Sequence, residues 1–268
     1  YQLQRINEAL EASNHDLQQF ASVASHDLQE PLRKIHMFSK LIRDKHIDLL
    51  PDEARVYLEK IMQSSGRMKS IITNVLNFSR LSAEDNKFEY VNLDEIIRDL
   101  FEDLEITIRE RNASIDVGEM CQIQVIRGQI RQVFQNLISN SLKFSRPGVP
   151  AKVTIRSERV ATREFQSPVA EEGPYCRITI SDNGIGFEKK FKDNIFALFH
   201  RLHSKDRYEG TGIGLAIVKK IVEKHNGIIT ADGTLDEGAT FMIILPVSHE
   251  NSVEQKKLIY DQTDSSGG

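Results

Sequence analysis

The stretch Ser25-His26-Asp27-Leu28-Gln29-Glu30-Pro31-Leu32 lies inside a long helical pattern. Upstream of it, residues recur at alternating steps of three and four, the a/d seam of a coiled coil: Leu3, Ile6, Leu10, Ser13, Leu17, Phe20 and Ala24. On that register His26 falls two positions past the seam, so we expect its side chain to face solvent beside Asp27. Pro31 should bend the helix, because it removes an amide donor and crowds a carbonyl one turn earlier.

A second helix follows a break at residues 44–52, which contains Pro51. The same spacing continues through Ala54, Leu58, Ile61, Ser65, Met68, Ile72, Val75 and Ser79. Two such helices with a short connection form an antiparallel hairpin. A hairpin is too shallow to bury both seams alone, so we predict a homodimer through residues 1–82 that completes a four-helix bundle.

From about Phe88 the pattern changes to mixed helix and strand. The predicted strands are residues 88–92, 114–118, 122–126, 152–157, 175–181, 228–231 and 240–245, and the predicted helices are 94–111, 128–145 and 212–225. Because these elements do not alternate regularly, we predict an α+β layer, with one mixed sheet and helices on one face. The predicted domains are an all-α hairpin at 1–85 and an α+β domain at 86–248, followed by a flexible tail at 249–268.

Composition narrows the function classes. The net charge of −4 argues against a nucleic-acid-binding surface, and no apolar run approaches the roughly 20 residues that span a bilayer. Two cysteines without metal-ligand spacing, Cys121 and Cys176, fit a reducing, cytoplasmic compartment. The chain opens on Tyr1, so we expect a fragment whose upstream sensor, and any membrane anchor, lie outside it.

One candidate pocket residue ends a predicted strand. Cys176, Ile178 and Ile180 share one face of that strand, and Asp182 continues the face. An unpaired carboxylate there is costly, and an exocyclic amine such as that of adenine would satisfy it. The glycines of Asp182-Asn183-Gly184-Ile185-Gly186-Phe187 permit a close backbone approach. A tight turn at Asn183-Gly184 explains the same segment equally well.

A second glycine-rich segment, Gly210-Thr211-Gly212-Ile213-Gly214, precedes the last predicted helix. Unpaired amides at a helix N-terminus, together with glycines, make a phosphate cradle. A dinucleotide-binding fold would need a strand before this segment. Residues 205–209 are polar, so the segment favours the phosphate cradle without that fold.

A third candidate lies on the helix predicted at 128–145. Asn136, Asn140 and Lys143 are spaced i, i+4, i+7 and therefore share one helix face. The amide oxygens can hold Mg²⁺, and the lysine can meet phosphate charge. A solvated polar face accounts for the same spacing, and the motif taken alone favours that explanation.

Taken in order, these segments resemble the sensor histidine kinases of two-component signalling, over about residues 15–247. The matching boxes are His26–Leu32 (phospho-acceptor), Asn136–Phe144 (N), Asp182–Gly186 (G1), Ile195–Phe199 (F) and Gly210–Leu215 (G2). The resemblance implies a dimeric hairpin followed by a Bergerat-type ATP-binding α/β sandwich of the GHKL type. It also implies that ATP phosphorylates His26 with Mg²⁺ present, and that an aspartate of a response-regulator receiver domain then takes the phosphoryl group.

The resemblance also implies residue roles. His26, Asp27, Asn140 and Lys143 would be catalytic, with Nε2 of His26 attacking, and Asn136 and Asn140 would hold Mg²⁺. The implied ATP-binding residues are Asn136, Asn140, Lys143, Phe144, Asp182, Gly184, Gly186, Phe187, Gly210, Thr211, Gly212, Gly214, Leu215 and Thr240. Residues 188–209 would form a lid, which Phe196 and Phe199 anchor or attach to the helical domain.

Two departures from the family pattern stand out. Asp236-Glu237-Gly238-Ala239-Thr240 lacks the first glycine of the family's late G-x-G-T. Glu30 stands where relatives that dephosphorylate their partner carry Thr or Asn, and its charge would repel an aspartyl phosphate. Glu30 therefore argues against phosphatase activity.

Two other functions are compatible with parts of the pattern. One is another ATPase with the same nucleotide fold, but such proteins lack a phospho-acceptor helix. The other is a dimeric scaffold that binds nucleotide without labelling itself.

Overall fold

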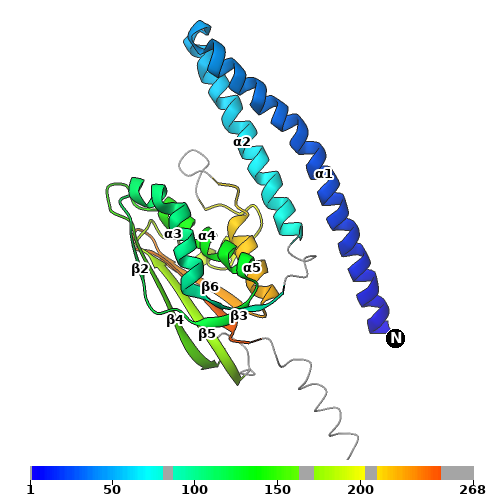
Figure 1. Ribbon diagram of the computed structural model, residues 1–268, viewed down its shortest axis with the longest axis vertical. Coiled ribbons are helices and arrows are strands. Elements are labelled where there is room, and N and C mark those ends of the chain that lie inside the picture. Colours follow the sequence, from blue (N-terminus) through cyan, green and yellow to red (C-terminus); the bar gives the residue numbers. More distant parts are fainter. Residues whose placement is uncertain (1, 81–86, 163–171, 203–209, 249–268) are drawn as a thin grey trace, which may run out of the picture. The chain divides into compact units, whose positions relative to one another are not determined.

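The computed structural model in Figure 1 describes residues 2–80, 87–162, 172–202 and 210–248. The predicted tail at 249–268 and part of the predicted lid, 203–209, lie outside the described residues. The chain divides into two compact units. The first comprises Tyr1–Asp85 with Leu198–Gly214, and the second comprises Asn86–Ala197 with Leu215–Gly268.

The first unit contains the predicted helical hairpin. Helix α1 (Gln2–His46) continues through Pro31, a single 3-10 turn follows at Ile47–Leu49, and α2 (Asp52–Arg80) returns along it. The amide of Arg55 donates to the carbonyl of Pro51, so the proline stands just before the first turn of α2. Most side chains of the predicted seam at residues 3–24, and that of His26, lie outside the described side chains.

The buried face of α2 differs in part from the predicted seam. Leu58 and Ser65 are buried as expected, and Met62 is buried beside them. Ile61 and Met68, also predicted in the seam, are 47% and 45% exposed. They lie one helical position away from the stripe that packs against α1, and therefore form part of a second apolar face of the hairpin.

The second unit is built on a five-stranded sheet with the order β2-β4-β5-β7-β6. Its strands are β2 (Ser114–Val117), β4 (Lys152–Thr162), β5 (Glu172–Asp182), β6 (Ile228–Thr234) and β7 (Gly238–Pro246). Only β2 and β4 pair in parallel, so the sheet is mixed, as predicted.

The prediction of a single sheet was wrong. Strand β1 (Glu89–Asn92) pairs with β3 (Gln122–Val125) in a separate antiparallel ribbon. The chain turns away from the large sheet after β2, and the carbonyl of Cys121 accepts from the amide of Leu93. Strands β1 and β3 therefore pair with each other outside the ladder of the large sheet. Strand β3 also meets the end of that sheet, because the Gln124 amide donates to the Val247 carbonyl.

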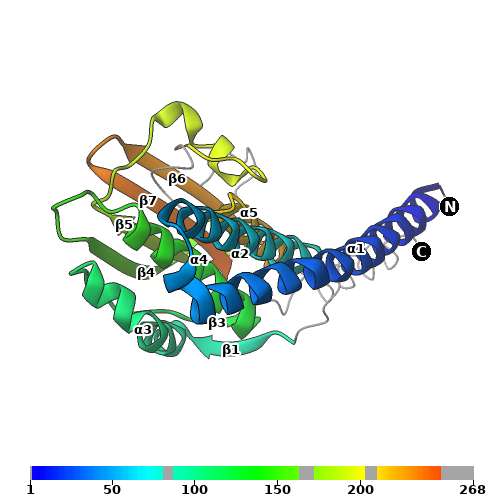
Figure 2. The same ribbon diagram turned by 90° about the horizontal axis from the view of Figure 1, so that it is seen from above.

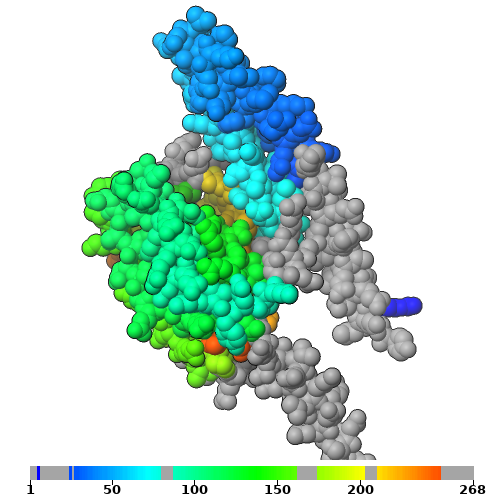
Figure 3. Space-filling model, in the orientation of Figure 1, coloured from blue at the N-terminus to red at the C-terminus, as the bar shows by residue number. Residues whose placement is uncertain are grey.

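Helices α3 (Leu93–Glu110), α4 (Arg127–Lys143) and α5 (Gly214–Lys224) lie on one side of the large sheet, as predicted (Figures 1 and 2). Figure 3 shows α3 and α4, in teal and green, occupying most of the drawn face of this unit. Their fully buried side chains include Leu93, Ile96, Leu100, Phe134, Leu137 and Leu142. Helix α5 stops where expected, with Asn226 at φ +54° and the Gly227 amide donating to the Val222 carbonyl.

Candidate functional site

Asp182 stands at the end of β5, on the strand's buried face. Cys176, Ile178 and Ile180 on that face are at most 1% exposed, which places the Asp182 carboxylate at the edge of the core. The hydroxyl of Ser141 donates to its Oδ2 at 3.0 Å. Part of the cost of burying this carboxylate is therefore offset within the chain, because α4 brings a donor to it.

Two backbone amides complete the surroundings of this carboxylate. The amides of Gly184 and Ala239 donate to Asp182 Oδ1 at 2.9 and 3.2 Å. Burial raises the pKa of Asp182, and the hydrogen bonds from Gly184, Ser141 and Ala239 partly offset that rise. Among the described residues, no lysine or arginine forms an ion pair with it. Since an ionised carboxylate has about four acceptor positions, three donors leave room for one more.

The glycines after Asp182 are required by contacts within the chain. A Cβ on Gly184 would lie 2.6 Å from the carbonyl oxygen of Phe144. Gly186 has φ +61°, and its Cβ would lie 1.9 Å from the carbonyl oxygen of Thr234. The close backbone approach that the sequence predicts here is thus an approach of the chain's own backbone.

Two other predicted pocket residues support this loop. Phe187 is 6% exposed and packs on Gly233, whose Cβ would lie 2.8 Å from the ring. The hydroxyls of Thr240 and Ser181 share a hydrogen bond of 2.9 Å between β7 and β5. Both contacts fix the strands and the loop around Asp182, and a role for Phe187 or Thr240 in ligand binding stays a prediction.

Asn136, Asn140 and Lys143 are half-buried on α4, and Phe144 follows the last turn. The side-chain nitrogen of Asn136 is buried and has no hydrogen-bond partner among the described residues. A buried amide without a partner is costly, so this group fits a site that a polar ligand completes. Lys143 Nζ lies 4.5 Å from the centre of the Phe144 ring.

The described residues contain no cluster of three or more His, Cys, Asp or Glu side chains able to hold a metal ion. A metal here would depend on amide oxygens and on the oxygens of a bound phosphate. Mg²⁺ is commonly held in this way, with few protein ligands. Asn136 could supply its side-chain oxygen to such a site, whereas its buried Nδ2 is a donor and would instead meet an acceptor on the ligand.

The glycine-rich segment belongs to the first unit. Gly212 has φ +72°, and its carbonyl accepts from the amide of Phe199 at 3.0 Å. The hydroxyl of Thr211 accepts from Nδ2 of Asn74 on α2 at 3.2 Å. That Gly210, Thr211, Gly212 and Gly214 meet Asp182 or Asn136 stays a prediction, and so does the role of Leu215, which follows in α5.

The two aromatic residues predicted to anchor the lid differ in their surroundings. Phe196 is 8% exposed and belongs to the core of the second unit. Phe199 is 57% exposed and has φ +61°. The Phe196 ring is therefore packed inside its unit, whereas the Phe199 ring is open to solvent. That either residue anchors a lid stays a prediction.

His26 and Asp27 lie on α1, a little more than one turn before Pro31. The side chain of Asp27 is exposed. Glu30 forms an exposed ion pair with Lys34 one turn later, with 2.8 Å between Oε1 and Nζ. Glu30 thus lies on the same helix as His26, in an exposed ion pair.

Two residues of the site escaped the sequence prediction. Ser141 is 2% exposed, and its only signal is a polar residue among apolar neighbours in α4. Arg146 donates from Nε to the carbonyl of Asn183 at 2.9 Å and from Nη1 to the carbonyl of Asp236 at 2.7 Å. Asp236 takes the missing glycine's place with φ +62°, a conformation that aspartate tolerates better than most residues.

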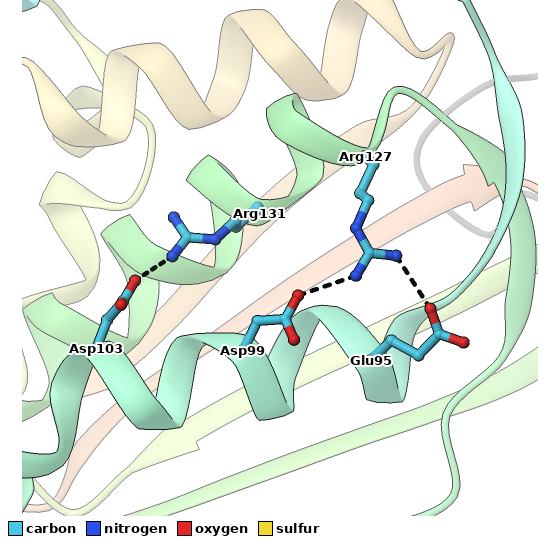
Figure 4. Close-up of polar contacts among 5 residues, drawn as sticks. All are labelled: Glu95, Asp99, Asp103, Arg127 and Arg131. Carbon is cyan, nitrogen blue, oxygen red and sulfur yellow. Dashed lines mark hydrogen bonds and ion pairs between the residues drawn. The ribbon is translucent and has the colours of Figure 1, made fainter.

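An ion-pair ladder joins α4 to α3 (Figure 4). Arg127 contacts Glu95 at 3.0 Å and Asp99 at 2.9 Å, and Arg131 pairs with Asp103. The hydrogen bonds to Glu95 and Asp99 raise the pKa of Arg127. The ladder therefore joins the helix that carries Asn136 to its neighbour through charges on the outer surface.

Comparison with known proteins identifies both halves of the chain. Residues 16–84 match the family of the His Kinase A (phospho-acceptor) domain. Residues 126–249 match the histidine kinase-, DNA gyrase B-, and HSP90-like ATPase family. The second match covers the helix, loop and strands that surround Asp182.

Among curated relatives, the phytochrome-like protein Cph1 of Synechocystis is 33% identical over 248 residues, 92% of this chain and 31% of its own length. Cyanobacterial phytochrome A of Nostoc is 35% identical over 246 residues, 92% of this chain and 30% of its own. The chain thus spans about a third of the length of these relatives.

Solved structures share the fold. Full-length ShkA in complex with AMPPNP has a TM-score of 0.63 at 23% identity, over 85% of this chain and 45% of its own. ThkA in complex with the response regulator TrrA has a TM-score of 0.57 at 24% identity, over 87% and 62%. With a phospho-acceptor domain followed by its ATPase domain, the chain belongs to the sensor histidine kinases of two-component signalling.

Proposed function

We propose that this chain transfers the γ-phosphoryl group of ATP to His26 and then to an aspartate of a response-regulator receiver domain. The observation that carries the proposal is the Asp182 carboxylate, with three neutral donors and one acceptor position left. The exocyclic amine of adenine is a donor that fits this position. The unpartnered amide of Asn136 supports a second polar contact with the nucleotide.

At the phospho-acceptor, a neutral imidazole is the nucleophile. Nε2 of His26 forms a bond to the γ-phosphorus while the bond to the β,γ-bridging oxygen breaks, and ADP leaves. The Asp27 carboxylate accepts a hydrogen bond from the N–H of the other ring nitrogen, which fixes the tautomer and offsets the positive charge that develops on the ring. In the second step the N–P bond breaks as a receiver carboxylate oxygen bonds to phosphorus.

The phosphate end of ATP would be held by the remaining predicted residues. Asn136 and Asn140 would hold Mg²⁺, which offsets phosphate charge when it is bound. Lys143 would meet the phosphates, and the amides of residues 210–214 would line them. With its charge on the acceptor helix, Glu30 would disfavour dephosphorylation of the partner.

A second copy of the chain would complete the hairpin. Leu28, Ile35, Phe38 and Ile42 on α1 are 41–56% exposed in the single chain, and they share a face at heptad-like spacing. Ile61 and Met68 add to the exposed apolar surface from α2. Burying these faces in a homodimeric four-helix bundle would remove them from water.

The proposal places this fragment in the cytoplasm, downstream of a sensor that it does not contain. The length of the relatives supports an additional region in the whole protein. None of the described helices has an apolar stretch long enough to cross a bilayer.

Incubation with γ-labelled ATP and Mg²⁺ tests the proposal, with His26→Gln and His36→Gln run in parallel. We expect an acid-labile, alkali-stable label on the wild type and on His36→Gln, but none on His26→Gln. Label that survives in His26→Gln would contradict the assignment of the acceptor. Bound ATP without any label would favour the scaffold function.

A further inference from the structure

The position of the Asp182 carboxylate depends on two backbone segments that meet at the end of β5. The loop after Asp182 supplies the Gly184 amide, and the turn between β6 and β7 leads to the Ala239 amide. Both amides donate to the same oxygen, Oδ1. Any shift between loop and turn therefore changes the direction of the carboxylate.

A ring of hydrogen bonds joins these segments to the end of α4. The Ile185 amide donates to the Phe144 carbonyl at 2.9 Å, and the Asp236 amide donates to the Ile185 carbonyl at 2.8 Å. Arg146 closes the ring, because its guanidinium donates to the carbonyls of Asp236 and Asn183. Arg146 follows Phe144 by two residues, so the ring starts and ends on the same helix terminus.

Asp236 takes part in this ring through its backbone alone. With φ +62°, its amide reaches Ile185 while its carbonyl reaches Arg146. The guanidinium is planar and rigid, so its two bonds fix the distance between loop and turn better than a flexible side chain would. A Cβ on Gly238 would lie 1.9 Å from the Asp182 carbonyl oxygen, which shows how closely the two segments already pack.

We propose that Arg146 is a positioning residue for base recognition: it holds loop and turn so that Asp182 presents its remaining acceptor position to the base. The inference rests on the proposed function, because it needs Asp182 to receive the nucleotide base. A carboxylate held in this direction favours the 6-amino group of adenine and repels the 6-oxo group of guanine. Arg146 thereby contributes to the preference for adenine nucleotides without touching the nucleotide.

Calorimetric titration of the full chain with ADP and with GDP, both with Mg²⁺, tests the inference. For Arg146→Gln we expect affinity for ADP to fall about tenfold, as for the loss of a charge-assisted hydrogen bond. Affinity for GDP should change much less, so the ratio of ADP affinity to GDP affinity should fall. Arg146→Lys should recover part of the loss, because an ammonium group can still donate to one carbonyl.

Arg156→Gln is the matched control. Its guanidinium also donates to two backbone carbonyls, those of Asp116 and Ile155, but on β2 and β4. This variant should keep the wild-type affinity for both nucleotides. If Arg146→Gln leaves the ratio of ADP affinity to GDP affinity unchanged, the positioning role is overturned.

The two proposals fail differently in this experiment. A wild-type chain that binds ADP no better than GDP would contradict the assignment of Asp182 and with it the proposed pocket. A wild-type chain that prefers ADP, with the same preference in Arg146→Gln, would overturn the inference about Arg146 alone.

Discussion

Carboxylates of the second unit lie in two opposite kinds of surroundings. On the α3–α4 ladder, Glu95, Asp99 and Asp103 face two arginines, and all these side chains are 34–59% exposed. At the end of β5, Asp182 is more deeply buried, accepts from three neutral donors among the described residues and has a raised pKa. The ladder neutralises its charges within the protein, whereas the pocket keeps one carboxylate available to a ligand.

The largest effect should come from the tight backbone contacts behind Asp182, which the ladder lacks. Gly186→Ala would place a Cβ 1.9 Å from the Thr234 carbonyl oxygen at a positive φ. We expect the free energy of unfolding to fall by about 3 kcal/mol or more, as measured by urea denaturation. Gly128→Ala on α4 is the control: nothing lies within 4 Å of its Cβ, so stability should hold or rise. Equal losses in the two variants would contradict this account.

Asp182→Asn should separate stability from binding. The amide can accept from Gly184 and Ala239 and donate to Ser141, so the nucleotide-free chain should melt no lower than wild type. Affinity for ATP should fall about 10- to 100-fold, because the charged acceptor is lost. Asp99→Asn in the ladder should leave the affinity for ATP unchanged and slightly lower the stability of the chain. Thermal melting and calorimetry on both variants measure the contrast, and a large drop in the melting temperature of Asp182→Asn would refute it.

The pH dependence of stability should differ between the two regions. Because the pKa of Asp182 is raised above its ordinary value of 3.8, the folded chain keeps this proton to higher pH than the unfolded chain does. Between the two pKa values, the contribution of Asp182 to the free energy of unfolding therefore falls as pH rises. The stability of Asp182→Asn relative to wild type should grow through this window and then level off. Urea denaturation across acidic pH measures this difference in the free energy of unfolding. A difference that does not change with pH would contradict a raised pKa at Asp182.

The smallest effect belongs to the ladder. A double-mutant cycle of Arg127→Gln and Asp99→Asn should give a coupling of about 0.2–1 kcal/mol, because the pair is exposed to water. High salt should reduce that coupling further. Urea denaturation at low and high salt measures it. A coupling of several kcal/mol that salt does not affect would mean that the ladder behaves like a buried network.

Local sequence patterns predicted most helices and strands. The predictions that failed depend on contacts between residues that are distant in sequence. The stop at Asn226-Gly227 and the buried face that leads to Asp182 follow from neighbouring residues alone. The donors to Asp182 from Ser141 and Ala239 lie 41 and 57 residues away, so spacing along β5 could not reveal them. Likewise, the pairing of β1 with β3 depends on which edges meet in space, and the strand patterns do not contain that information.

The most direct test of the pocket combines a change in the protein with a change in the ligand. Affinities of wild type and Asp182→Asn would be measured for ATP and for the purine analogue that lacks the 6-amino group. The account predicts that removing the amine weakens binding to wild type by about tenfold and hardly affects the variant. Equal losses on both proteins would show that Asp182 does not receive the base, and would contradict the central claim.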